Sequence, residues 1–151
     1  MSTSFVLPAG VGYLAGAFFS TVLLLLGQTY VVVQARAGSG VAYPRIYADK
    51  AEMEANPKAV QFNCAQRAHQ NTLENLPMLY TMTGVTALKY PMLAAGALGL
   101  WSLARVGYTV GYSTGDPKKR TNLLSVLHYP ILLTLLGSSG YTVMQLVCAE
   151  L

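Results

Sequence analysis

The stretch FNCAQRAHQNTLENLP, residues 62–77, places an arginine, a histidine, several amides and a carboxylate directly ahead of an apolar run. In a helix, four of its polar side chains recur at i, i+3, i+4 and i+7 and share one face: Arg67, Gln70, Asn71 and Glu74. His69 points roughly the opposite way. Because ionisable groups at the edge of a bilayer are costly unless paired or hydrated, the stripe predicts a functional site with Arg67 and Glu74 as partners. The alternative is a set of hydrogen bonds that joins helices.

The composition indicates a small integral membrane protein. Of 151 residues, 53% are hydrophobic and 11% are charged, whereas a soluble domain has roughly 25% charged residues. The formal net charge is +4, but the cations are too dispersed to form a nucleic-acid-binding patch. We therefore expect membrane lipid around the protein, no nucleic-acid partner and no metal cofactor.

Four apolar spans account for most of the chain, which we interpret as one membrane domain, residues 1–151. Each span is long enough for the roughly 20 residues that a bilayer requires, and they cover residues 10–33, 67–88, 92–112 and 122–147. Polar loops at 34–61 and 113–121 and a very short turn at Pro91 join them. The sequence predicts an all-α, four-transmembrane-helix bundle with up-down topology. The second and third helices should be antiparallel neighbours, and Pro130 should kink the fourth.

The distribution of lysine and arginine predicts the orientation in the membrane. Seven of these residues lie in the first and third connections: Arg36, Arg45, Lys50, Lys58, Lys118, Lys119 and Arg120. Only Lys89 lies in the second connection. The positive-inside rule therefore places the two basic connections in the cytosol and both termini in the lumen.

The two cysteines and the first residues of the chain lead to two further predictions. Cys64 should lie near the cytosolic face and Cys148 near the luminal face, so we expect two free thiols. The segment MSTSFVLPAG has neither a basic region nor a convincing cleavage site, so the first span is expected to remain in the mature protein.

A second polar constellation lies on the third span. Arg105, Tyr108 and Tyr112 recur at i, i+3 and i+7 on one helical face, directed toward the same membrane side as the polar half of the second span. Tyrosines also favour the membrane interface for structural reasons. The GxxxG formed by Gly107 and Gly111 indicates close packing rather than catalysis.

An excess of cations distinguishes this end of the molecule. Four arginines gather around one cytosol-facing zone: Arg36, Arg67, Arg105 and Arg120. Glu74 is the one carboxylate expected at the level of the membrane there. Because unbalanced cations favour an anionic ligand, the zone predicts an anion-binding site.

Two segments resemble a known family. RAHQNTLENLP, residues 67–77, and ARVGYTVGYSTGDPKKR, residues 104–120, are similar to the membrane-associated proteins in eicosanoid and glutathione metabolism (MAPEG), and within them to the microsomal glutathione S-transferases of the type-three branch. The resemblance implies a homotrimer of four-helix subunits, with glutathione held as a substrate between neighbouring subunits near the cytosolic face. It also implies the endoplasmic reticulum, or the outer mitochondrial membrane, as the location.

The resemblance also implies roles for particular residues. One subunit would bind glutathione through Arg67, Asn71, Glu74, Tyr108 and Tyr112, with Arg105 beside them. Arg36 and His69 would be contributed by the neighbouring subunit. Arg120 resembles the catalytic arginine of the family, and Lys119 competes with it because the spacing after Tyr112 varies among relatives. Asn75 stands where some members have a tyrosine, a difference that affects the choice of substrate.

Glutathione chemistry is consistent with these residues. The tripeptide presents two carboxylates to arginines and an ammonium to a carboxylate, and its thiol must ionise before it attacks. We expect a transferase that joins glutathione to lipophilic electrophiles, with lipid hydroperoxide peroxidase or leukotriene C4 synthase-like activity through the same thiolate. The alternative within the same family is a lipid-binding scaffold without catalysis. A channel is disfavoured because the charges gather at one face.

Overall fold

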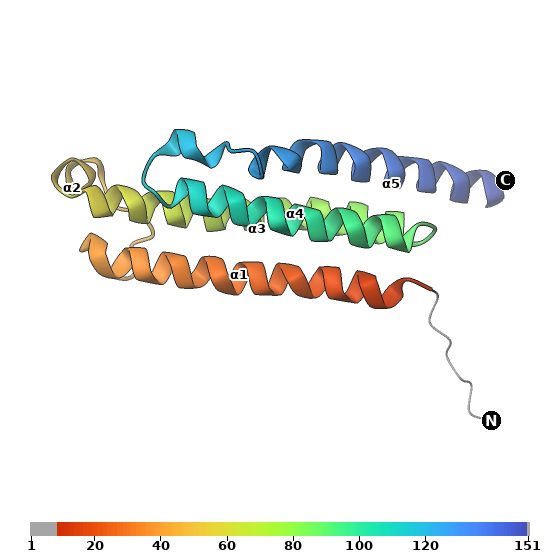
Figure 1. Ribbon diagram of the computed structural model, residues 1–151, viewed down its shortest axis with the longest axis horizontal. Coiled ribbons are helices and arrows are strands. Elements are labelled where there is room, and N and C mark those ends of the chain that lie inside the picture. The colour runs from red at the N-terminus through yellow and green to blue at the C-terminus, as the bar shows by residue number, and fades with distance from the viewer. Residues whose placement is uncertain (1–8, 151) are drawn as a thin grey trace, which may run out of the picture.

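The computed structural model describes residues 9–150, and within them every regular element is helical. Four long helices lie side by side: α1 (Val11–Ser39), α3 (Pro57–Ala87), α4 (Pro91–Tyr112) and α5 (His128–Glu150) (Figure 1). Three short elements join them: α2 (Lys50–Ala55) and the 3₁₀ turns η1 (Pro117–Arg120) and η2 (Ser125–Leu127). The predicted all-α class is confirmed.

Two segments are long and apolar enough to cross a membrane, namely Val11–Ser39 and Ser125–Glu150. They correspond to the first and last of the expected spans. Helices α3 and α4 pack between them over most of their length, joined by the short turn before Pro91 (Figure 1). Large apolar side chains on the outside of α1 and α5, such as Leu26 and Leu133, are exposed, as expected for a protein surrounded by lipid.

The first connection is shorter than the loop expected at residues 34–61. Helix α1 continues to Ser39 and stops at Gly40, whose φ of 77° is a left-handed conformation that favours glycine. Helix α3 begins at Pro57, because the Asn56 side chain accepts a hydrogen bond from the amide of Lys58 and proline suits the first helical position. The expected spans were bounded where the sequence stops being apolar, whereas the helices α1 and α3 extend past those bounds.

The fourth helix also begins later than residue 122, where the span was expected to start. Asn122 and Ser125 exchange two hydrogen bonds: the Asn122 amide donates to the Ser125 hydroxyl (2.8 Å), and the Ser125 amide donates to Asn122 Oδ1 (3.0 Å). This local turn delays the α-helix until His128. Pro130 therefore lies in the first turn, where amides have no intrahelical acceptor, so the expected kink is wrong.

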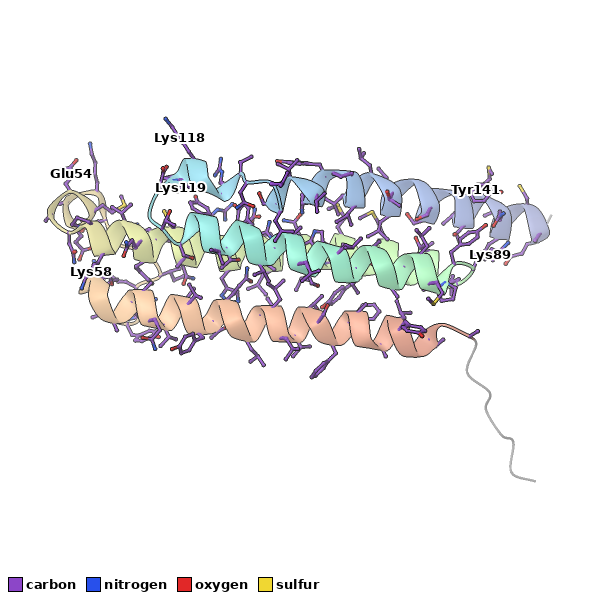
Figure 2. The ribbon with its side chains drawn as sticks, viewed as in Figure 1. Glu54, Lys58, Lys89, Lys118, Lys119 and Tyr141 are labelled. Atoms are coloured by element: carbon purple, nitrogen blue, oxygen red, sulfur yellow. The ribbon has the colours of Figure 1, made fainter. Side chains whose placement is uncertain are left out.

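The two basic connections lie at the same end of the molecule. Lys58, Lys118 and Lys119 are at this end, whereas Lys89 is at the opposite end (Figure 2). The apolar core between the ends takes buried side chains from all four long helices: Leu24, Leu79, Leu98, Trp101 and Leu135. The core fixes how α3, α4 and α5 approach one another just below the basic end.

Candidate functional site

A polar cavity of about 400 Å³ lies between α3, α4 and the segment that leads into α5. Four of the predicted site residues line it: Asn71, Arg105, Tyr108 and Arg120. Its other polar lining residues come from α3 and from residues 121–129. No aspartate or glutamate of residues 9–150 is part of this lining. The cavity is therefore cationic, with two guanidinium groups and no carboxylate in its wall.

Arg105 forms the buried side of this cavity. It is only 3% exposed, and its Nε and Nη2 donate to the Thr72 hydroxyl at 3.1 and 2.9 Å. Nη2 also donates to Asn71 Oδ1 at 2.9 Å. The Tyr108 ring lies against the guanidinium, with 4.0 Å between Cζ and the ring centroid. All of these partners are neutral, so they orient the guanidinium and leave its charge without a counterion among the described residues.

The Thr72 hydroxyl joins three helices at the level of the cavity. It donates to the Ala68 carbonyl within α3 (3.1 Å) and accepts hydrogen bonds from Arg105 of α4 and from Gln28 Nε2 of α1 (2.8 Å). Gln28 and Thr72 are both fully or almost fully buried. Neither residue was predicted from the sequence, because an isolated threonine or glutamine in an apolar span carries no distinctive pattern.

Arg67 and Glu74 form the ion pair predicted from their spacing. Arg67 Nη1 lies 2.8 Å from Glu74 Oε1, and both side chains are nearly half exposed. Neither residue lines the cationic cavity. An exposed pair of this kind contributes only about 0–1 kcal/mol to stability. Each of the two groups could therefore leave its partner and bind an opposite charge on a ligand.

The segment that carries Arg120 is held against α4 by a very close approach. A Cβ atom at Gly111 would lie 2.0 Å from the backbone oxygen of Lys119, and one at Gly107 would lie 2.9 Å from the Leu124 side chain. Asn122 Nδ2 also donates to the Gly107 carbonyl at 2.8 Å. The GxxxG therefore does serve close packing, but its partner within the described chain is this connection and not another long helix.

The close packing of this connection on α4 places Arg120 and Lys119 differently relative to the cavity. Arg120 lines the cavity, and its Cζ lies 5.6 Å from the centroid of the buried Tyr112 ring. Tyr112 in turn packs edge-on against Tyr108, with 5.6 Å between ring centroids and an interplanar angle of 87°. Lys119 is exposed and does not line the cavity. Tyr112 thus supports the cavity wall from behind and does not line it.

Arg36 and His69 lie outside the cavity. Arg36 Nη1 donates to the carbonyls of Arg45 (2.8 Å) and Val41 (3.3 Å), and its guanidinium stacks on the rings of Tyr43 and Phe62. It therefore holds the first connection against α3. His69 is half-buried and forms no hydrogen bond with any residue from 9 to 150. Within one chain, neither residue reaches the other predicted site residues.

The MAPEG family model matches residues 14–141, which include every residue of the cationic cavity. The chain belongs to the MAPEG family. This family includes glutathione transferases and eicosanoid synthases, and its members are generally membrane-associated and glutathione-binding. The two apolar helical segments are consistent with association of this MAPEG protein with a membrane.

Several cavity residues of this MAPEG protein were not identified as binding residues from the sequence. Asn75, Ser125, His128 and Tyr129 all line the cavity. His128 is fixed by Trp101, whose Nε1 donates to His128 Nδ1 at 2.9 Å, so the ring is neutral with its proton on Nε2. For Ser125, His128 and Tyr129, the signal in the sequence was the polar residues scattered among leucine and valine from 121 to 129, in a segment otherwise interpreted as apolar.

Proposed function

We propose that this protein is a glutathione transferase that joins the glutathione thiolate to lipophilic electrophiles dissolved in the membrane. The observation that supports this best is the cationic cavity, where Arg105 and Arg120 present two guanidiniums and no carboxylate opposes them. Such a wall favours an anionic ligand. Membership of a family that generally binds glutathione supports glutathione as this anion.

The charges of glutathione match the groups around the cavity. Its two carboxylates would bind the guanidinium groups, with Arg67 released from its exposed pair. Glu74, released at the same time, would bind the ammonium. The Asn71 amide and the Tyr108 hydroxyl offer neutral hydrogen bonds, and Arg105 would bring a positive potential without moving, because Thr72 and Asn71 already hold it.

Activation of the thiol is assigned to Arg120. A free thiol has a pKa of roughly 8.5, so most of it is protonated at neutral pH. A guanidinium beside the sulfur stabilises the thiolate and does not itself deprotonate. Arg120 is the cation of the exposed connection that lines the cavity, whereas Lys119 does not line it. The same thiolate would reduce lipid hydroperoxides or open an epoxide in a leukotriene C4 synthase-like reaction.

The assembly that completes this site is a homotrimer in which all four long helices cross the membrane. His69 lacks a hydrogen-bond partner within residues 9–150, and Arg36 lines an open hollow on the outside of α1, so both could contact a neighbouring subunit. The basic connections would lie in the cytosol, with both termini in the lumen of the endoplasmic reticulum or beyond the outer mitochondrial membrane.

The test is the ultraviolet absorbance of the thiolate when glutathione binds to the purified protein at neutral pH. We expect a thiolate signal with the wild-type protein and none with Arg120→Ala. Turnover of a lipophilic electrophile should fall on the order of 10²-fold in Arg120→Ala, as it does when one preorganised electrostatic group is removed. Lys119→Ala is the matched control and should keep both the signal and the turnover.

The reverse pattern would transfer the activating role to Lys119. Persistence of the thiolate signal in both variants would make the connection a determinant of topology alone. Failure of the wild-type protein to bind glutathione in calorimetry would reject the transferase and favour the lipid-binding scaffold.

A further inference from the structure

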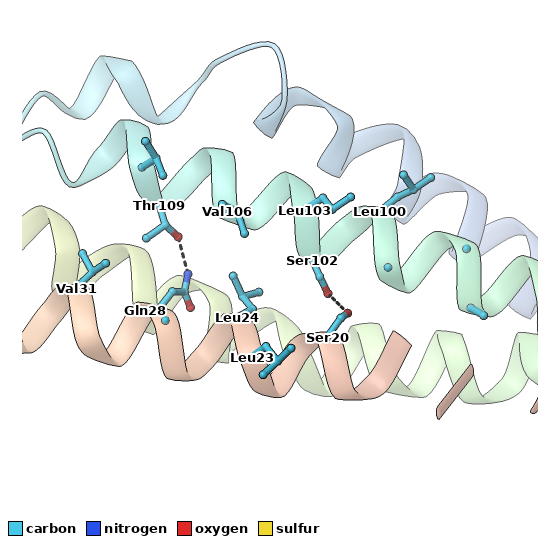
Figure 3. Close-up of a pocket in the computed structure, with 15 residues that line it drawn as sticks. Ser20, Leu23, Leu24, Gln28, Val31, Leu100, Ser102, Leu103, Val106 and Thr109 are labelled. Atoms are coloured by element: carbon cyan, nitrogen blue, oxygen red, sulfur yellow. Dashed lines mark hydrogen bonds between the residues drawn. The ribbon is translucent and has the colours of Figure 1, made fainter. Parts of the chain in front are cut away.

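A second and larger cavity lies between α1 and α4 and shares no lining residue with the cationic cavity. Its volume is about 740 Å³, and its walls are mainly leucine and valine (Figure 3). Several wall residues are about half exposed, including Leu23, Leu100 and Leu103, so the groove is open to the side. Gly27, Gly96 and Gly99 leave it hollow, because a Cβ atom at any of them would have no neighbour within 4 Å.

Gln28 gives this apolar groove a buried hydrogen-bond acceptor. The side chain is 2% exposed and lines the groove. Its Nε2 donates to the hydroxyls of Thr109 (2.7 Å) and Thr72 (2.8 Å). Its Oε1 has no hydrogen-bond partner within residues 9–150 and almost no exposed surface, so a ligand in the groove would reach it by moving the surrounding side chains slightly apart. A buried acceptor of this kind is rare without a partner, because burial removes its bonds to water.

The orientation of the Gln28 amide follows from its neighbours. Thr109 donates its hydroxyl proton to the Arg105 carbonyl (2.8 Å), and Thr72 donates its own to the Ala68 carbonyl (3.1 Å). Both hydroxyls can therefore only accept from Gln28, which requires the amide nitrogen on their side. Oε1 must face away from them, and a ligand that satisfies it must provide a donor.

The position of Gln28 along the groove determines how such a ligand would lie. Gln28 and Thr109 are near the end that faces the basic connections, and the groove runs from there along α4 to Ala95 (Figure 3). That stretch of α4 spans roughly 22 Å at about 1.5 Å per residue. A smaller hollow continues past Gly96 to Met92. Ser20 and Ser102 bond to each other inside the groove (3.0 Å) and so require no ligand.

We propose that this groove binds one membrane lipid with a single slender chain and a hydroxyl head, as in a long-chain alcohol. The hydroxyl would donate to Gln28 Oε1, and the chain would lie over the three glycines toward Met92. A fatty-acid carboxylate is disfavoured, because it only accepts hydrogen bonds and would oppose the amide oxygen. A hydrocarbon chain alone would leave Oε1 without a partner.

The experiment uses the full chain in phosphatidylcholine nanodiscs and a long-chain alcohol with a photoactivatable diazirine on its chain. We expect saturable labelling of peptides from α1 and α4, with unlabelled hexadecanol as an effective competitor. Hexadecyl methyl ether keeps the chain but cannot donate, so it should compete about fivefold less well. This comparison changes only the ligand, so it does not depend on how a variant folds.

A variant that fills the groove gives a second measurement. Gly99→Leu should lower the affinity for the alcohol more than about tenfold, because the added side chain occupies the space of the ligand. Gly137→Leu on α5 is the matched control: its Cβ also has no neighbour within 4 Å, and it does not line the groove. Labelling should be unchanged in that variant.

Three results would overturn the proposal. The first is equal competition by the alcohol and the ether, and the second is equal labelling of Gly99→Leu and Gly137→Leu. The third is an absence of saturable labelling together with disulfide cross-links between two chains through Leu103→Cys, which would assign the groove to a contact between subunits. The assay contains no glutathione, so its outcome is independent of the proposed transferase activity.

Discussion

Gly111→Ala should separate the position of Arg120 from the stability of the fold. The new Cβ atom would lie 2.0 Å from the Lys119 backbone oxygen, whereas ordinary contacts are 3.4–4 Å. The obstacle is backbone, so the connection that carries Arg120 must shift by roughly 1 Å or more. A displacement of that size at a reacting centre costs on the order of 10²-fold in rate. We expect a loss of turnover of that order and a weaker thiolate signal at neutral pH.

The stability of the fold should change much less than the turnover. Alanine favours a helix over glycine by about 1 kcal/mol, which offsets part of the strain. Turnover of a lipophilic electrophile, thiolate absorbance and the unfolding temperature in detergent would be measured together. The nearest atoms to the new Cβ of Gly107→Ala belong to the Leu124 side chain, so an intermediate effect is expected, whereas Gly137→Ala meets nothing within 4 Å and should have none. Wild-type turnover in Gly111→Ala would refute the argument that close packing of Gly111 on the Lys119 backbone positions Arg120.

Three further outcomes are expected. Glu74→Gln should weaken glutathione binding in calorimetry without changing the pKa of the bound thiol, and an unchanged affinity would remove Glu74 from the site. Thr72→Val should lower the free energy of unfolding by about 1–3 kcal/mol, because Arg105 and Gln28 lose a buried acceptor, and a wild-type unfolding curve would show that this acceptor is dispensable. Burial, and to a lesser extent a nearby negative charge, raises the pKa of the Cys64 thiol. Its alkylation rate should therefore rise only at a higher pH than that of a free thiol, which a pH series with iodoacetamide would check.

Helical periodicity predicted the parts of the site that lie within one helix. The Arg67–Glu74 pair could be predicted because residues seven apart share a face, and the structure confirms it. The joint location of Asn71 and Arg105 followed from the short turn at Pro91, which requires α3 and α4 to be antiparallel neighbours. Both predictions depend on the backbone of regular helices, whose geometry is nearly independent of the surrounding sequence.

The parts that could not be predicted depend on contacts between irregular segments and helices. Whether Gly111 packs on a helix or on a connection depends on the path of residues 113–127, which has no regular period. From the sequence, His128 was assigned to an apolar span. Its contact with Trp101 joins residues far apart in the sequence, so periodicity along one helix could not reveal it. Pro130 was expected to kink a helix that in fact begins just before it, because the turn between Asn122 and Ser125 could not be detected by periodicity.

The Thr72 hydroxyl links the two cavities through one set of hydrogen bonds. It has a single proton, which it donates to Ala68, so its lone pairs are shared between Gln28 on one side and Arg105 on the other. Arg105 therefore cannot turn toward a ligand without giving up its hydrogen bonds to Thr72 and Asn71. Electrostatic stabilisation is most effective when the charged group does not have to reorient as the ligand binds. The buried Gln28 amide of α1 donates to the same hydroxyl and so helps to orient the Thr72 oxygen that holds the cavity's innermost cation.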